Sequence, residues 1–112
     1  MTHDEIAEYN WDDGFAPIWP VVDDPATDSG TALLIYWRVE GPWLEKEEDV
    51  AVCNREAWHL NHILEARLLS GFYSSRRIRY DPVTDNQLSR VQVYKLKQAG
   101  VPVELIEPEW PL

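Results

Sequence analysis

The sequence has few of the features on which disulfide-stabilised, secreted or membrane-bound proteins depend. It contains one cysteine, Cys53, so no internal disulfide can form, which is typical of a reducing compartment. The longest uninterrupted apolar run, Ala32–Trp37, has six residues, whereas a membrane span needs roughly 20. The first five residues include the acidic Asp4 and Glu5, whereas a secretory signal peptide has basic residues at this place. We therefore expect a cytoplasmic protein.

Positive charge is also scarce. The chain has 10 Lys and Arg against 20 Asp and Glu, a formal net charge of −10. This balance argues against binding to nucleic acid, which requires clustered cations, and against docking on anionic lipid. Residues 1–28 hold eight acids and no Lys or Arg, whereas residues 71–100 hold six bases against Asp81 and Asp85. The separation predicts a basic segment folded back on an acidic one, an acidic face for a basic partner, or an ordinary solvated surface.

With 112 residues, 45% of them hydrophobic and 27% charged, the chain fits one soluble domain. We expect residues 1–100 to form it and the proline-rich tail, residues 101–112, to pack on the same domain. The patterns favour a mainly α fold of about five helices with an irregular Pro-rich C-terminal tail. No Gly-rich phosphate loop, Ser nucleophile elbow or Cys-x-x-Cys occurs, and such absences weigh modestly against an enzyme.

Capping signals predict where the first helices begin. Thr2–Glu5 matches a capping box, so a short helix is expected to run to about Tyr9. Pro20 suits the first turn of a short helix through Asp24. Asp28–Thr31 has the pattern of the N-terminus of a third helix, and Gly41-Pro42 would end it. A helix is therefore predicted over about residues 29–40.

Apolar spacing predicts the later helices. Residues 45–70 form the clearest helix, with an apolar stripe at spacings of three and four: Val50, Cys53, Ala57, Leu60, Ile63, Leu64 and Leu68. Residues 72–80 are ambiguous and suit an extended connection. Thr84–Gln87 is a candidate capping box for a helix to Ala99 whose apolar face would comprise Leu88, Val91, Tyr94 and Leu96. The three prolines of the tail exclude a long helix there.

Three features offer candidate chemistry. His59, His62 and Glu65 lie three apart on the long helix, but an open zinc site needs a better ligand set, so surface or interface histidines are favoured. Cys53 lies in the apolar stripe, which favours a core role over a nucleophile. No cofactor and no metal is therefore expected.

Asp12 and Asp13 stand side by side on a predicted turn. They could cap a following helix, pair with Arg76–Arg79, contact a partner, hold a cation or divide acid and base roles. Capping or internal ion pairing is the favoured interpretation. The six tryptophans are mostly expected in the core, but Trp19 and Trp43 neighbour prolines in loop-like sequence and suit exposed anchors.

Four stretches of the sequence resemble one known family: residues 9–15 (Tyr-Asn-Trp-Asp-Asp-Gly-Phe), 28–33, 80–82 and 91–97. It is the bacterial domain-of-unknown-function family number 4274, and the resemblance covers roughly residues 3–98. The family name implies a small bacterial protein and carries no activity or catalytic residue. By analogy alone, stand-alone acidic domains of this class are often immunity proteins that neutralise a toxin.

The function expected from these observations is non-catalytic binding of a protein with a basic surface, most plausibly a toxin. The predicted partner-binding residues are Asp12, Asp13, Trp19, Asp23, Asp24 and Trp43. An alternative is a small enzyme or ligand-binding domain with a pocket between Trp11-Asp12-Asp13 and Arg76–Arg79. A third is a domain that only self-associates; a monomer or weak homodimer is expected.

Overall fold

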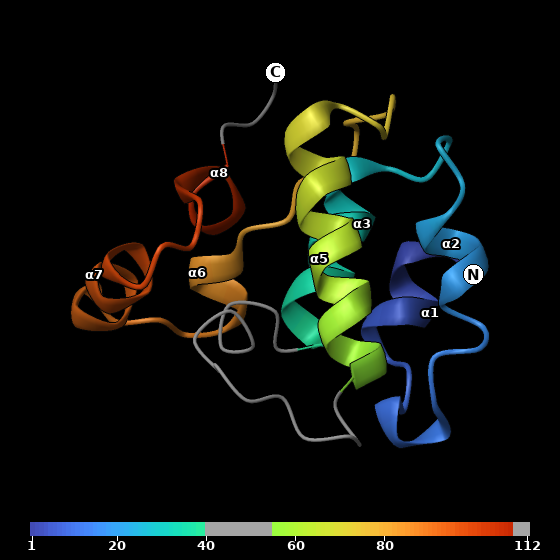
Figure 1. Cartoon of the computed structure of the whole chain (residues 1–112), viewed down its shortest axis with the longest axis horizontal. Coiled ribbons are helices and arrows are strands. Elements are labelled where there is room, and N and C mark those ends of the chain that lie inside the picture. Colours follow the sequence, from blue (N-terminus) through green and yellow to red (C-terminus); the bar gives the residue numbers. More distant parts are fainter. Residues whose placement is uncertain (40–54, 109–112) are drawn as a thin grey trace.

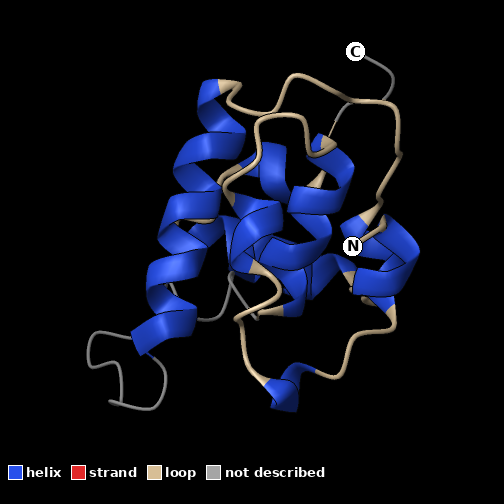
Figure 2. Cartoon of the chain, turned by 90° about the vertical axis from the view of Figure 1, so that its right-hand side faces the viewer, coloured by secondary structure: helices blue, strands red, loops and turns tan. Residues whose placement is uncertain are grey.

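The computed structural model describes residues 1–39 and 55–108. These residues form seven α-helices and one 3-10 helix, so the predicted mainly α fold is confirmed (Figures 1 and 2). The number exceeds five because several short segments each complete one helical turn. The elements are α1 (His3–Ala7), η1 (Trp11–Asp13), α2 (Trp19–Val22), α3 (Ser29–Arg38), α5 (Arg55–Ser70), α6 (Pro82–Asp85), α7 (Arg90–Gln98) and α8 (Val103–Ile106).

The core forms around α3. Every residue from Ser29 to Trp37 is buried, although the helix is only 10 residues long. α5 packs along one side of α3 and buries Leu60 and Leu64, while α1 packs against another side through Ile6. The apolar stripe predicted for the long helix therefore holds at Leu60 and Leu64; Val50 and Cys53 lie outside the described residues.

The caps predicted from sequence at the N-terminal end are present. Thr2 and Glu5 make both hydrogen bonds of a capping box at α1. Pro20 lies in the first turn of α2, and Asp28 caps α3 by accepting a hydrogen bond from the Gly30 amide at 2.8 Å. In Figure 1, α1 and α2 lie toward one end of the molecule's longest axis, α3 and α5 lie in the middle, and α6, α7 and α8 lie toward the other end.

Residues 72–80 are an extended connection that folds back along the loop before α3. The Ser29 amide donates to the Ser75 carbonyl at 2.8 Å, and Asp28 and Ser75 form an isolated parallel bridge. The hydroxyl of the buried Tyr73 donates to the Val22 carbonyl at 2.7 Å. The acidic and basic segments therefore do meet, as one interpretation of the charge pattern predicted, but largely through backbone groups.

One prediction about the C-terminal helices is wrong, and another holds only in part. Thr84 lies inside α6, which Asp81 caps, and the capping box belongs to Ser89 and Gln92 at the start of α7. Of the predicted apolar face, Leu96 is buried and Leu88 packs against the core, but Val91 and Tyr94 are exposed and Val93 is buried in their place. The apolar residues of α7 lie on two opposite sides, so spacing alone selected the wrong pair.

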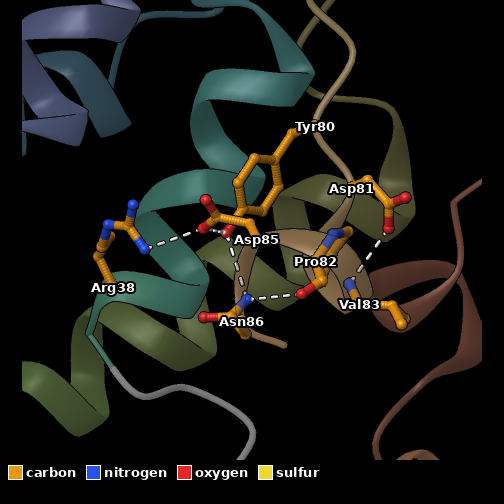
Figure 3. Close-up of polar contacts among 7 residues, drawn as sticks. All are labelled: Arg38, Tyr80, Asp81, Pro82, Val83, Asp85 and Asn86. Carbon is orange, nitrogen blue, oxygen red and sulfur yellow. Dashed lines mark hydrogen bonds and ion pairs between the residues drawn. The ribbon is translucent and has the colours of Figure 1, made fainter. Parts of the chain in front are cut away.

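A network of side chains attaches α6 to the end of α3 (Figure 3). Arg38 on α3 pairs with the Asp85 carboxylate at 3.0 Å, and the Tyr80 hydroxyl donates to the same oxygen at 2.7 Å. Asn86 donates to the Pro82 carbonyl at 2.8 Å. Burial, and then the hydrogen bond to Asp85, raise the pKa of Tyr80. Asp85, one of the two acids in residues 71–100, therefore serves to stabilise the fold.

The tail packs on the domain where it is described, and part of it is helical rather than irregular. Pro102 precedes α8, whose Leu105 and Ile106 are buried. The buried Trp37 indole donates to the Leu105 carbonyl at 2.8 Å, which ties the tail to α3. Among the described residues, no helix combines the length and apolar character that crossing a membrane requires.

Candidate functional site

The turn after α1 is rigidly constructed. Asn10 caps η1 by accepting a hydrogen bond from the Asp12 amide at 3.2 Å. The Tyr9 hydroxyl donates to the Gly14 carbonyl at 2.6 Å, closing the turn from the other side. Gly14 has φ of +89°, a left-handed conformation that glycine adopts without strain.

Aromatic side chains hold this turn on the core. The Trp11 ring meets the Tyr9 ring edge to face, with centroids 5.2 Å apart, and lies 6.2 Å from the Phe15 ring. All three side chains are partly buried and pack against the core. The apolar residues of the motif thus anchor the turn, and its two carboxylates remain on the outside.

Asp12 and Asp13 are exposed, and among the described residues their carboxylates have no hydrogen bond or ion pair. The favoured interpretation, helix capping or internal ion pairing, is therefore wrong. Asp4 and Glu8 of the neighbouring helix are also exposed, and their carboxylates have no partner in this part of the chain. We call these four residues the acidic surface. It combines four unneutralised charges with a backbone fixed by caps.

Asp23 and Asp24 differ from the acidic surface because each already has a local role. Asp23 pairs with Arg67 at 2.8 Å, yet 57% of its side chain remains exposed. Arg67 also donates to the Val22 carbonyl at 3.0 Å, so this pair ties α5 to the end of α2. Asp24 accepts a hydrogen bond from the Ala26 amide at 2.9 Å and shapes the loop before α3. Both carboxylates remain accessible to a partner.

Trp19 belongs to a patch that the sequence analysis did not assemble. Its indole donates to Glu56 at 3.2 Å, and its ring lies 6.0 Å from that of His59. Further along α5, the exposed Trp58 stacks on His62, with ring centroids 4.0 Å apart. We call Trp19, Glu56, Trp58, His59 and His62 the aromatic patch. One sign of this patch was present in the sequence: Trp58 and His62 are four residues apart on one helix, so their side chains are neighbours.

The two histidines of the long helix do not form a metal site with Glu65. Each ring lies against a tryptophan, and His62 Nδ1 is 2.9 Å from the Trp58 carbonyl oxygen. Among residues 1–39 and 55–108, no group of three or more His, Cys, Asp or Glu side chains could hold a metal ion. Trp43, the remaining predicted anchor, lies outside the described residues.

Among the acids in the described part of the chain, Asp28 makes the most polar contacts. One carboxylate oxygen accepts from the amides of Gly30 at 2.8 Å and Ile78 at 3.2 Å. The other accepts from the Ser75 hydroxyl at 2.8 Å and the Arg77 amide at 2.6 Å. Burial alone would raise the pKa of Asp28, but these four hydrogen bonds outweigh it and lower the pKa. Asp28 is therefore a structural residue, not part of a binding surface.

The pocket predicted between Trp11-Asp12-Asp13 and Arg76–Arg79 is not present. The turn containing η1 and the connection of residues 72–80 lie toward opposite ends of the molecule (Figures 1 and 2). A hollow of about 290 Å³ lies between the start of α6 and the end of α8; it is lined by Arg79 of the predicted pocket but not by Trp11, Asp12 or Asp13. Its two carboxylates are engaged, since Asp81 caps α6 and Glu107 pairs with Lys97 at 3.0 Å.

Comparison with known proteins identifies one family. The family described as "Domain of unknown function (DUF4274)" matches residues 1–69, which include the acidic surface, the aromatic patch and α3. No curated protein and no solved structure matches the chain. The matched residues end near the end of α5, so α6, α7 and α8 lie beyond them.

Proposed function

Because the chain belongs to the family Domain of unknown function (DUF4274), whose description assigns no activity, we propose a function from the geometry. The protein is a non-catalytic binder of a partner with a basic surface. In a bacterial cytoplasm the best-suited role is that of an immunity protein that neutralises a toxin by direct contact. The observation that carries the proposal is the unpaired acidic surface on a rigid turn.

Charge at such a surface serves association. Asp12 and Asp13 are already held in place by the caps and aromatic packing of η1, so little ordering is needed when a partner arrives. With Asp4 and Glu8 they extend a negative potential into solvent, which steers a basic partner and raises its association rate. At contact, each carboxylate is available for a charge-assisted hydrogen bond to Arg or Lys.

The aromatic patch supplies the second component of a protein interface. Trp58 is 37% exposed, and Trp19 is partly buried and fixed by its hydrogen bond to Glu56. Tryptophan is enriched among the residues that dominate binding energy because it buries a large area with few rotatable bonds. Together with Asp23 and Asp24, this patch suits a partner that presents both cations and an apolar surface.

The exposure of Asp12 and Asp13 favours binding over acid–base catalysis. Catalytic carboxylates are usually placed where burial or a neighbouring charge separates their roles. Here both are open to solvent, and the hollow of about 290 Å³ is lined by other residues. A surface of this kind favours contact with a macromolecule rather than enclosure of a substrate.

The proposal is tested by co-expressing the chain with a growth-inhibiting protein encoded next to its gene. We expect the wild-type chain to restore growth and the D12N/D13N variant to lose most of that protection while remaining folded. E104Q removes an exposed acid on α8 and should protect like the wild type. Failure of the wild-type chain to protect, or full protection by D12N/D13N, would contradict the proposal.

A further inference from the structure

The outer side of α7 is unusually apolar for a solvent-facing helix surface. Val91 is 61% exposed and Tyr94 is 63% exposed. The two residues are three apart and therefore lie side by side on the helix. The core contacts of α7 are made instead by Val93 and Leu96, which are buried. The outer pair therefore lies mostly outside the packed core.

Cations flank this exposed pair. Arg90 and Lys95 are exposed, and neither side chain has a hydrogen bond or ion pair with any residue in the described ranges. Lys97 on the same helix is engaged by Glu107 at 3.0 Å. α7 contains no acid. Its outer side, defined by Arg90, Val91, Tyr94 and Lys95, therefore combines apolar area with two unneutralised positive charges.

The acidic surface and the outer side of α7 lie far apart on the molecule. α1, η1 and α2 occupy one end of the longest axis and α7 the other (Figure 1), and that axis extends over 36 Å. A single copy cannot bring the two surfaces together. Two copies aligned head to tail can, because the end of one then meets the opposite end of the next.

We propose that the outer side of α7 docks on the acidic surface of a second copy of this chain, giving head-to-tail association. Arg90 and Lys95 would face Asp12 and Asp13 of the next copy, and Val91 and Tyr94 would be covered by the contact. A symmetric pairing of two α7 helices is disfavoured because it would place like charges together. A head-to-tail contact leaves one free surface at each end, so it extends into open oligomers.

The contact is expected to be weak. α7 has nine residues, which at 1.5 Å per residue gives a helix of about 13 Å, so the buried area falls at the small end of interface sizes. The net charge of −10 also makes copies repel one another at long range. At about 0.15 M salt the Debye length is about 8 Å, which screens that repulsion but leaves close pairs effective.

The test is sedimentation equilibrium of the whole chain at 0.15 M salt, from about 10 μM to 1 mM. We expect the average mass of the wild type to rise with concentration. V91S/Y94S and K95E should each remain monomeric, as should D12K/D13K. L69S changes an apolar residue that is 48% exposed on α5 and should associate like the wild type.

A mixture distinguishes head-to-tail docking from other arrangements. K95E keeps an intact acidic surface and D12K/D13K keeps an intact α7, so their equimolar mixture should form dimers and nothing larger. A monomeric wild type at 1 mM would overturn the inference, as would self-association of D12K/D13K or a mixture that stays monomeric. The V91S/Y94S variant should still protect cells from the toxin, which separates a failure here from a failure of the proposed function.

Discussion

Two regions of the N-terminal part of this protein use aspartate in opposite ways. At the start of α3, Asp28 accepts four hydrogen bonds from groups on two segments of the chain. At η1, Asp12 and Asp13 accept none from any described residue. A count of charged residues in the sequence does not distinguish Asp28 from Asp12 and Asp13. The comparison teaches that negative charge is available to a partner only where the fold has not already neutralised it.

The largest expected effect comes from G30A, which breaks the Asp28 region directly. A Cβ at residue 30 would lie 2.0 Å from the Ile78 carbonyl oxygen, so the connection of residues 72–80 would have to move off α3. We expect a loss of about 3–5 kcal/mol in the free energy of unfolding. The control is G100A: nothing lies within 4 Å of its Cβ, so only strain at φ of +97° remains and about 1 kcal/mol should be lost. Urea unfolding measures both.

D28N is expected to cost about 2 kcal/mol at neutral pH, because it removes a charge that accepts several hydrogen bonds. The folded protein holds the pKa of Asp28 below its ordinary value of 3.8. Its contribution is therefore complete above that value and is lost as the pH falls through the lower folded pKa. The difference between wild type and D28N should shrink below about pH 4. A difference that stays constant from pH 7 to pH 2.5 would contradict this role.

E65Q tests the reverse case. The Glu65 carboxylate is partly buried and accepts no compensating hydrogen bond from the residues that the structure describes. Burial raises the pKa of Glu65 above 4.5, so stability falls as the pH rises through 4.5 toward the folded pKa. E65Q should therefore be slightly more stable than wild type at pH 7, by less than about 1 kcal/mol because solvent screens the group. Thermal unfolding at pH 4 and pH 7 tests the sign, and a less stable variant at pH 7 would refute it.

The smallest effect on stability is expected at the acidic surface. D12N and D13N remove carboxylates that have no partner among the described residues, so each should lie within about 0.5 kcal/mol of wild type. Urea unfolding measures both variants, with D28N as the reference because it also replaces one Asp by Asn. A cost above 1 kcal/mol for either variant would show that η1 depends on its acids and would weaken the comparison.

Local chemistry allowed the sequence to predict much of the fold. Thr2, Pro20 and Asp28 marked the starts of α1, α2 and α3 correctly, because caps depend on a few neighbouring residues. The predicted face of α7 was wrong at Val91 and Tyr94, since Val91 and Val93 are equally apolar and only the position of the core selects between them. The other three partners of Asp28, which are Ser75, Arg77 and Ile78, could not be predicted because they lie 47 to 50 residues away along the chain.

The same distinction between local patterns and long-range contacts explains how much of the site could be predicted from the sequence. The stretch from Asn10 to Gly14 predicted a turn with two adjacent carboxylates, and the structure has that turn. Its isolation from Arg76–Arg79 depends on how distant segments pack, which local patterns do not encode. The aromatic patch required α2 to meet α5 at Trp19 and Glu56, again a long-range contact.

The central claim is that the acidic surface acts by its exposed charge. The most direct measurement is the stopped-flow association rate with the neutralised toxin, from 0.05 to about 0.5 M salt, for wild type, D12N/D13N and E104Q. The account predicts a wild-type rate that falls steeply with salt, as steered association does. D12N/D13N should be roughly tenfold slower at low salt, and E104Q should behave like wild type. Rates unaffected by both salt and the Asp12 and Asp13 changes would contradict it.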